Sequence, residues 1–490
     1  MALINNLNLQ FEDDLFHVGI IGGGIAGSTI ALRLSELGIR VTLLEKGPSL
    51  VNGPPICHLH AGGNFYREIS DQQCLTLLRQ SIDTLKIYPY SANLRPTVFA
   101  LPKYDKSTPN DLLPRLKLLQ AEYEALIEKD ISNKVLGSAD EYYRFYSREQ
   151  LEILAQKIDP ITPECLDDWM IPVAKNIDYS QVQFPLLLIQ EYGLSVFRLA
   201  ATASLATDIL PDCHVLTHTQ VTNIEKSENK QGWTISIDSQ VTETKTLEVD
   251  YLINACGFKT GEVDDMLNLK RVRMVEFKAA YIAHWNQYQG YWPEVIFYGE
   301  RGTPQGMAQL TPSTNGYFQL HGMTEDITLF KGGLVSSDGN SSQPQLSERF
   351  LKKIDSAWEA GSVRSRTEKS IDHIAQFLPS FRSAIVGGEP LFGAQQIPGI
   401  DPDNRVADVS FSGNNYARTE IVKASSALDA ADLIIDKFIE KKLLEQKSLK
   451  CSKQLITSHY FPVTQSLSLN SITKKAELLA KQRNYPADIA

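Results

Sequence analysis

Three glycines in the first thirty residues are spaced in a way that could bind phosphate. Gly22, Gly24 and Gly27 lie between a short apolar run and a segment whose apolar residues recur at helical spacing. In such a turn the first glycine permits the tight bend, the second lets backbone approach a pyrophosphate, and the third lets the helix pack on the strand. The first helical residues, Ile25 and Ala26, offer unpaired N–H groups to the phosphates. We therefore expect these five residues to bind a dinucleotide.

A carboxylate completes this unit. Glu45 ends a second apolar run, and it stands 18 positions after Gly27. That spacing is close to the ~20 residues at which an acid in such a unit binds the ribose hydroxyls. A glycine-rich turn without a ligand would not need this acid. The stretch 17–45 therefore predicts a βαβ dinucleotide-binding unit, with Glu45 and the adjacent Lys46 in the site.

The rest of the chain favours one flavin dinucleotide over a nicotinamide. No second G-x-G-x-x-G occurs in the sequence. A nicotinamide enzyme would be expected to continue with further βαβ units, whereas residues 271–318 are rich in aromatic residues and alternate like an antiparallel sheet. The expected cofactor is FAD.

Composition excludes several other classes. A chain of 490 residues is too long for one simple core, and its 43% hydrophobic and 22% charged content is ordinary for a globular enzyme. The formal net charge of −10 argues against a nucleic acid partner. Six cysteines without a C-x-x-C pair predict no metal site and no disulfide framework, and they fit a reducing, cytoplasmic setting.

The two ends of the chain carry opposite charge. Residues 1–15 are acidic and lack the apolar core of a signal peptide, and no apolar run approaches the ~20 residues of a membrane-spanning helix. From Lys437 onward ten Lys or Arg face four Asp or Glu, a net of +6 that leaves −16 on residues 1–436. Such a basic amphipathic segment could make peripheral contact with an anionic membrane. The interpretation that we favour is a final helix packed on the nucleotide-binding unit, so that deletion of 446–490 leaves the FAD content unchanged.

Periodicity and turn residues give the expected elements and domains. Helices are expected over 71–87, 112–129, 147–155, 195–209, 345–362, 369–377 and 420–444, and strands over 96–101, 214–219, 221–225, 232–237, 249–257 and 405–413. We assign 15–100, 185–265 and 380–436 to a discontinuous nucleotide-binding domain, 101–184 and 266–379 to a substrate domain, and 437–490 to a basic C-terminal helical extension.

Four stretches together resemble the D-amino-acid-oxidase-like superfamily of FAD-dependent oxidoreductases, within the glutathione-reductase-like flavin fold. They are Gly22 to Gly27 with Glu45, the segment His60-Ala61-Gly62-Gly63, Val221 with Asn254-Ala255-Cys256-Gly257, and the segment Gly413 to Arg418. The resemblance covers most of 17–436. It implies an α/β fold, with an FAD-binding Rossmann-like domain and an inserted α+β substrate domain built on an antiparallel sheet.

The resemblance also implies how FAD is held. The segment His60-Ala61-Gly62-Gly63 would lie beside the isoalloxazine ring, and Val221 would contact the adenine end. Ala255 and Gly257 would lie near the pyrophosphate. The segment Gly413-Asn414-Asn415 would close over the pyrimidine of the flavin.

Residues of the substrate site are proposed from the chemistry. Oxidation by a flavin is a hydride transfer, so the protein mainly places the substrate and holds its charge. Because substrates of the resembling superfamily are often carboxylates, a guanidinium is the natural partner, and Arg301 and Arg418 are the candidates. His321 is a candidate base or hydrogen-bond donor, and Tyr416 a candidate wall of the pocket. The alternatives are surface arginines, a core histidine and a packing tyrosine.

The resulting hypothesis is an FAD-dependent oxidoreductase that takes a hydride from a small amine or amino acid and passes electrons to oxygen or a quinone. A 2-hydroxy acid is the alternative substrate. The alternative from another class is a non-catalytic protein that binds FAD as a structural or sensing element.

Overall fold

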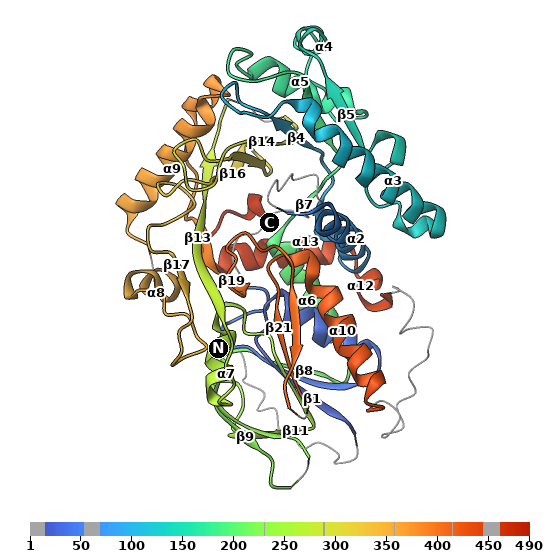
Figure 1. Ribbon diagram of the computed structural model, residues 1–490, viewed down its shortest axis with the longest axis vertical. Helices are drawn as coiled ribbons and strands as arrows, with labels where there is room; N and C mark the ends of the chain where they lie inside the picture. Colours follow the sequence, from blue (N-terminus) through green and yellow to red (C-terminus); the bar gives the residue numbers. More distant parts are fainter. Residues whose placement is uncertain are drawn as a thin grey trace.

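The apolar run that precedes the glycines forms β1 (His17–Ile21), which lies inside a six-stranded sheet. The computed structural model describes residues 15–490 except 53–68, 230, 288–289, 357, 414 and 444–460. The strand order of this sheet is β20-β21-β12-β1-β2-β8 (Figure 1). Its other strands are β2 (Arg40–Leu44), β8 (Cys213–Leu216), β12 (Tyr251–Asn254), β20 (Asp408–Phe411) and β21 (Tyr416–Glu420).

Parallel pairing brings the carboxyl ends of the central strands to one edge. Ile21 of β1 is paired with Leu44 of β2 on one side and with Asn254 of β12 on the other. Asn254 is in turn paired with Arg418 of β21. In open α/β sheets, ligands bind outside this edge. The predicted βαβ unit is confirmed, with α1 (Ile25–Glu36) as its helix.

Helices cover one face of the six-stranded sheet. The helix α1 contacts α6 (Val196–Ile209) and α10 (Ala427–Glu440), and α6 contacts α13 (Leu469–Gln482). Ile30, Leu34 and Ile434 are fully buried in the core that these helices share. The opposite face carries a three-stranded antiparallel sheet of β9 (Thr219–Lys226), β10 (Trp233–Ser239) and β11 (Thr246–Val249).

A second sheet of ten strands stands against this unit. Its long curved strand β13 (Arg273–His284) pairs with four other strands and reaches from α7 to β16 in Figure 1. The others are β4 (Thr97–Ala100), β5 (Tyr143–Tyr146), β6 (Leu186–Ile189), β14 (Glu294–Phe297), β15 (Ala308–Pro312), β16 (Tyr317–Gly322), β17 (Leu334–Ser336), β18 (Ile385–Val386) and β19 (Leu391–Pro398). The expected antiparallel pairing within 271–318 is observed, and rings such as Trp285, Phe318 and Phe381 pack edge to face behind it.

The remaining elements connect and cover these sheets. They are α2 (Asp71–Ile87), α3 (Leu113–Lys129), α4 (Arg148–Leu154), α5 (Leu166–Asn176), α7 (Thr260–Met266), α8 (Glu348–Asp355), α9 (Ala360–Ala375), α12 (Pro462–Ser466) and the strand pair β3 (Ala92–Asn93) and β7 (Gly193–Leu194). Within the described residues, no helix combines the length and the apolar character needed to cross a membrane.

The α/β class is confirmed, but the two sheets divide the chain differently from our domain assignment. The strands β4, β6 and β19 fall in segments that we assigned to the nucleotide-binding domain, yet all three belong to the ten-stranded sheet. Their pairing partners are distant in sequence, as in the pairing of β19 with β13. Local composition carries no signal for such long-range pairing.

Two expected helical regions are wrong in part. The single helix expected over 420–444 is replaced by the end of β21, a connection at 421–426 and α10. The helices expected over 345–362 and 369–377 are α8 and α9, and α9 begins nine residues earlier than expected. In the first case the strand was missed because its buried residues are mostly polar, as the contacts of Arg418 and Glu420 show below.

Candidate functional site

The turn after β1 has the close contacts that require glycine. Gly22 has a φ of +99°, and a Cβ there would lie 2.5 Å from the Ala255 carbonyl oxygen. A Cβ on Gly27 would lie 1.9 Å from the Gly22 carbonyl oxygen. Both positions therefore exclude any side chain. The first and third glycines have the roles in turning and in helix packing that the sequence predicts.

Gly24 differs because the space beside it is open. It caps α1 in extended conformation, and no side chain hydrogen-bonds at this cap. A Cβ built on Gly24 would meet nothing within 4 Å. The first turn of α1 contains no acidic residue, so no side chain of the helix competes for its N–H groups. An open space at a helix N-terminus fits the pyrophosphate of FAD.

Glu45 lies against this turn. Its Oε2 accepts from the Gly23 N–H at 2.7 Å, and its Oε1 accepts from the Gly47 N–H at 2.6 Å. The carboxylate keeps further acceptor positions for ribose hydroxyls. The start of β9 runs alongside, since Thr219 N–H donates to the Glu45 carbonyl at 2.9 Å, and Val221 lies two residues further along that strand.

The end of β12 completes the same edge. The Cys256 thiol donates to the Ile21 carbonyl at 3.3 Å, which holds Ala255 and Gly257 beside the glycine turn. Gly257 has a φ of +57°, and a Cβ there would meet nothing within 4 Å. The residues predicted to contact FAD at 22–27, 45, 255 and 257 thus lie together at one edge of the sheet. That they contact FAD stays a prediction. Lys46 is exposed there. His60, Ala61, Gly62, Gly63 and Asn414 lie outside the described residues.

Gly413 and Asn415 lie elsewhere, which corrects their expected position over the flavin. They belong to the turn between β20 and β21, where the Asn415 carbonyl accepts from Leu252 N–H at 3.0 Å and from Trp233 Nε1 at 2.9 Å. Leu252 is near the amino end of β12, so this turn lies at the opposite edge of the sheet from Gly22. The segment that reaches the correct edge is instead 421–426, which follows β21 and precedes α10.

Tyr416 and Arg418 share a carboxylate rather than facing the open edge. The Tyr416 hydroxyl donates to Asp264 Oδ1 at 2.8 Å, and Arg418 donates to the same oxygen through Nε at 2.9 Å and Nη2 at 2.5 Å. Burial, and then the charge of Asp264, raise the pKa of the Tyr416 hydroxyl well above its ordinary value. The substrate roles predicted for Tyr416 and Arg418 would require both to leave Asp264.

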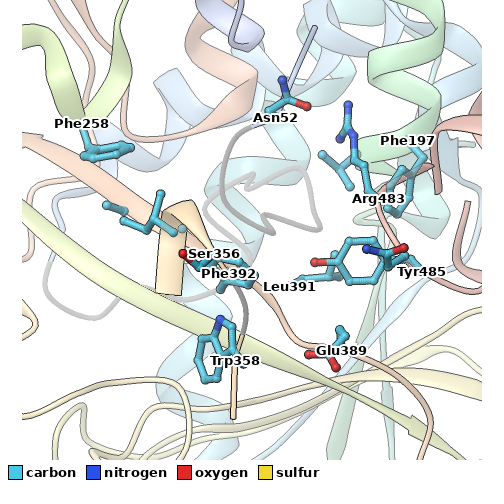
Figure 2. Close-up of a pocket in the computed structure, with 15 residues that line it drawn as sticks. Asn52, Phe197, Phe258, Ser356, Trp358, Glu389, Leu391, Phe392, Arg483 and Tyr485 are labelled. Atoms are coloured by element: carbon cyan, nitrogen blue, oxygen red, sulfur yellow. The ribbon is translucent and has the colours of Figure 1, made fainter. Parts of the chain in front are cut away.

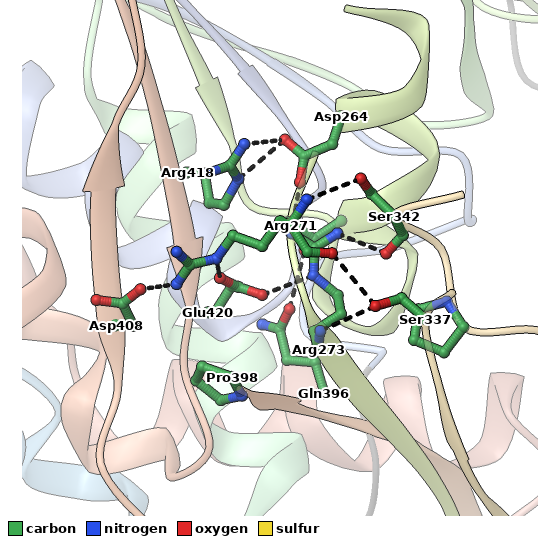
Figure 3. Close-up of polar contacts among 12 residues, drawn as sticks. Asp264, Arg271, Arg273, Ser337, Ser342, Gln396, Pro398, Asp408, Arg418 and Glu420 are labelled. Atoms are coloured by element: carbon green, nitrogen blue, oxygen red, sulfur yellow. Dashed lines mark hydrogen bonds and ion pairs between the residues drawn. The ribbon is translucent and has the colours of Figure 1, made fainter. Parts of the chain in front are cut away.

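These contacts belong to a larger buried ion network (Figure 3). Arg273 Nε lies 2.7 Å from Glu420 Oε1, and the Nη2 of Arg273 also contacts Asp264; all three side chains are fully buried. Arg271 Nε lies 2.7 Å from Glu420 Oε2, and Arg271 also pairs with Asp408. Three arginines thus face three carboxylates. The network ties β21 to α7 and to the start of β13, and its charges balance within the protein.

Arg301 lies in a second charged group, on the face of the ten-stranded sheet. It pairs with Glu276, whose other oxygen lies 2.7 Å from Lys278 Nζ. Lys278 also donates to Gln395 at 2.9 Å, and Gln395 donates to the Val422 carbonyl at 2.6 Å, so the group meets the segment before α10. Burial lowers the pKa of Lys278.

Lys423 adds a further buried amine to this group. Burial, and then the charges of Arg405 and Lys278, lower the pKa of Lys423 well below its ordinary value. Although burial opposes it, Lys278 and Arg301 lower the pKa of Glu276. The group therefore gathers more basic than acidic side chains where the ten-stranded sheet meets segment 421–426.

His321 lies on β16, where its Nε2 is 2.8 Å from Gln319 Nε2. It does not line the cavity described next. The role of His321 as a base or hydrogen-bond donor to the substrate stays a prediction. The contact with Gln319 is equally compatible with the alternative, a histidine that only packs in the core.

A cavity of about 550 Å³ lies where the glycine edge, the ten-stranded sheet and the C-terminal segment meet (Figure 2). Most of its lining is apolar or aromatic, and a few polar groups converge on it. The lining residues are Asn52, Val196, Phe197, Phe258, Ile354, Ser356, Trp358, Glu389, Leu391, Phe392, Gly393, Ala394, Arg483, Asn484 and Tyr485. The cavity adjoins the nucleotide edge, since Phe258 follows Gly257 and the neighbour of Asn52, Val51, donates through N–H to the Gly23 carbonyl at 2.8 Å.

The C-terminal residues of this lining were missed in the sequence. Arg483 and Tyr485 follow α13, whose Ile472 and Ala480 are fully buried in the core. The basic segment that we expected to pack as a final helix from Lys437 lies partly in 444–460, outside the described residues, whereas α13 packs on α6. The expectation that residues 446–490 are dispensable for FAD does not fit residues that line the cavity. In the sequence, Arg483 was counted only as one of the Lys and Arg residues that make the chain basic from Lys437 onward. The signal available was the position of Arg483-Asn484-Tyr485 directly after an amphipathic helix.

Comparisons with known proteins agree with this geometry. Residues 17–86 match the family model described as FAD dependent oxidoreductase. No curated protein sequence shows significant similarity to the chain.

Solved structures share the fold over nearly the whole chain. Glycine oxidase from Geobacillus kaustophilus aligns with a TM-score of 0.54 at 12% identity, covering 89% of this chain and 97% of that one. L-amino acid deaminase from Proteus vulgaris aligns with a TM-score of 0.55 at 13% identity, covering 92% and 98%. Glycerol-3-phosphate dehydrogenase from Bacillus halodurans, crystallised with FAD, aligns with a TM-score of 0.57 at 13% identity, covering 97% and 74%. At these identities the likeness establishes the fold alone.

Proposed function

The chain is an FAD-dependent oxidoreductase with the D-amino-acid-oxidase-like fold, and from this premise we propose that it takes a hydride from a small amine or amino acid. Electrons then pass to oxygen or a quinone. The observation that carries the proposal is the cavity, which adjoins the glycine edge and presents both an arginine and a carboxylate to an apolar, aromatic space. An amino acid has the complementary pair of charges.

The chain's own residues supply binding and orientation. Gly24 and the first turn of α1 hold the pyrophosphate, and Glu45 holds a ribose. FAD, when bound, supplies the hydride acceptor. The aromatic lining, including Phe197 and Trp358, excludes water and packs against the apolar part of the substrate.

The charged groups divide the remaining work. Glu389, at the exposed rim of the cavity, is the proposed partner of a substrate ammonium group. Lys278 and Lys423 are proposed to stabilise negative charge that builds up during hydride transfer. Arg301 is retained only as a weaker proposed partner of a substrate carboxylate, because it already pairs with Glu276 and does not line the cavity. Arg418 and Tyr416 are also weaker candidates because both bind Asp264.

A 2-hydroxy acid is the second candidate, because it undergoes the same hydride transfer and carries the same carboxylate. Glu389 favours the amine, since a hydroxy acid offers it no positive charge. A protein that binds FAD without turnover would show the same flavin site. Reduction of the flavin by a substrate would distinguish the two candidate enzymes from this non-catalytic protein.

Purified protein tests the proposal directly. Flavin absorbance in the visible region is expected, and anaerobic addition of amino acids or amines should bleach it. The matched panel should pair each amino acid with its 2-hydroxy acid analogue, for example phenylalanine with phenyllactate. Bleaching by hydroxy acids alone would favour the second candidate, and a bound flavin that no member of the panel bleaches would favour the non-catalytic one.

A further inference from the structure

Arg483 is held at the cavity by three hydrogen bonds, which use three of the five N–H donors of its guanidinium. Its Nη1 donates to the Val51 carbonyl at 3.1 Å, and its Nη2 donates to the Leu50 carbonyl at 2.9 Å and to Ser49 Oγ at 3.0 Å. Its Nε is buried and has no hydrogen-bond partner among the described residues. Figure 2 shows the guanidinium between Asn52 and Phe197. A buried donor without an acceptor is costly and requires an explanation.

The chain fixes this arginine from several sides. The helix α13 packs against α6. Val463 N–H donates to Oε1 of Glu36, the last residue of α1, at 3.2 Å. Past the arginine, the Tyr485 hydroxyl donates to the Pro390 carbonyl at 2.8 Å, beside the start of β19. The segment 461–490 therefore spans from the nucleotide-binding unit to the ten-stranded sheet, and Arg483 lies where it crosses the cavity.

The charge of Arg483 is retained although the side chain is partly buried. Burial lowers its pKa to about 10, so the guanidinium is protonated at neutral pH. The Cζ atom of Arg483 lies 5.6 Å from the centroid of the Phe197 ring. The loop that it anchors also supports the glycine turn, since Val51 N–H donates to the Gly23 carbonyl. A fixed cation that lines the cavity is suited to an anionic oxygen.

We propose that segment 461–490 forms one wall of the cavity and that the guanidinium of Arg483 binds an anionic oxygen of a ligand within it. The inference rests on the proposed function, because the ligand is either FAD, through its pyrophosphate, or the substrate, through a carboxylate. Both present the same chemistry to the guanidinium. Residues 461–490 are in this respect part of the site and not an appendage.

Two matched pairs of ligands distinguish the sources. Riboflavin lacks the phosphates of FAD, and benzamide lacks the charge of benzoate. Dissociation constants of FAD and riboflavin are measured on apoprotein by flavin fluorescence, and those of benzoate and benzamide on FAD-loaded protein by the change in flavin absorbance. The variant is Arg483→Gln. The control is Thr314→Val, which removes the bond from Thr314 Oγ1 to the Asp488 carbonyl at an exposed site outside the cavity.

The expected result is a loss of about tenfold in one selectivity ratio, as for a hydrogen bond to a charged group. A lower preference for FAD over riboflavin assigns the contact to the pyrophosphate, and a lower preference for benzoate over benzamide assigns it to a substrate carboxylate. Thr314→Val should change neither ratio. If Arg483→Gln does not fold, Arg483→Lys is measured in its place, and it should lower the same ratio by a smaller factor.

Unchanged ratios would overturn the inference, even if all four ligands bind more weakly, because an arginine that only supports loop 49–51 would affect both members of each pair equally. If the wild-type protein binds flavin and the Arg483 variants keep its two selectivity ratios, this inference alone is refuted. Wild-type protein that binds no flavin refutes the proposed function as well.

Discussion

Arg418 and Asp264 form a fully enclosed ion pair, with Arg418 Nε 2.9 Å from Asp264 Oδ1, and they join a strand of the nucleotide-binding sheet to a helix 154 residues earlier in the chain. The same carboxylate also serves Tyr416 and Arg273. Asp264 is therefore an acceptor on which three buried side chains converge. This arrangement makes it a structural residue with a large predicted effect on stability.

Asp264→Asn should destabilise the protein strongly, because Arg273 and Arg418 would keep their charge without a full counter-charge in a buried site. Breaking a buried pair in this way typically costs about 3–5 kcal/mol. The measurement is the free energy of unfolding from urea titration. Glu152→Gln breaks an exposed pair with Arg148 and should cost less than about 0.5 kcal/mol. Equal effects in the two variants would show that the network is not stabilising as described.

Gly24→Val and Gly27→Val form a matched test of the glycine turn. A side chain at Gly24 enters open space, so the protein should fold and lose FAD. A side chain at Gly27 would collide with the Gly22 carbonyl, so that protein should fold poorly or not at all. Circular dichroism reports the fold and the ratio of flavin to protein absorbance reports the cofactor. A Gly24→Val protein with full FAD content would contradict the pyrophosphate assignment.

Much of the site was predictable because its signals are local. Gly22, Gly24, Gly27 and Glu45 lie within one βαβ unit, and their roles depend on turns and spacing that a sequence shows directly. The end of β12 was also found, since buried strands with small residues at their ends are typical of this sheet edge.

The strand β21 was missed for a physical reason. Its sequence, Tyr-Ala-Arg-Thr-Glu, is not apolar enough to predict a buried strand, yet all five residues are buried. Its charges are acceptable there only because partners from distant elements, such as Asp264 and Arg273, neutralise them. Because a helix was expected from residue 420 onward, segment 413–415 was expected to be the connection that covers the flavin, in place of 421–426.

The role of Arg483 was hidden by distance in the chain. Its contact with Val51 joins residues 432 positions apart. Composition registered only a basic tail, and no local pattern indicates that such an arginine reaches back to the loop that follows the second strand. Contacts of this kind depend on tertiary packing, which here is the docking of α13 on α6.

Lys278→Met should make the bound flavin harder to reduce. A buried cation favours the added negative charge of a reduced cofactor, and its removal should lower the two-electron midpoint potential, by about 30 mV for each 1.4 kcal/mol of lost stabilisation. Lys352→Met, at an exposed position on α8, is the control and should leave the potential unchanged. Spectroscopic titration against a reference dye gives both values. An unchanged potential in Lys278→Met would place this charged group away from the flavin.

Glu36 should make stability depend on pH through the docking of the C-terminal segment. It accepts from Val463 N–H, and burial raises its pKa from 4.5 to about 7. Between these two values the unfolded chain has released this proton while the folded protein retains it. The folded state therefore loses stability as pH rises from 4.5 to 7, by less than about 1.4 kcal/mol per pH unit, and the loss levels off above 7.

Glu36→Gln removes this titration while keeping a polar side chain of the same size. Urea unfolding of both proteins at pH 5, 6 and 7 should show the variant gaining stability relative to the wild type at each step upward. The comparison cancels the titration of all other groups, since only Glu36 differs. Stability curves that run parallel across this range would show that Glu36 is already ionised in the folded protein, and that its contact with Val463 does not depend on a retained proton.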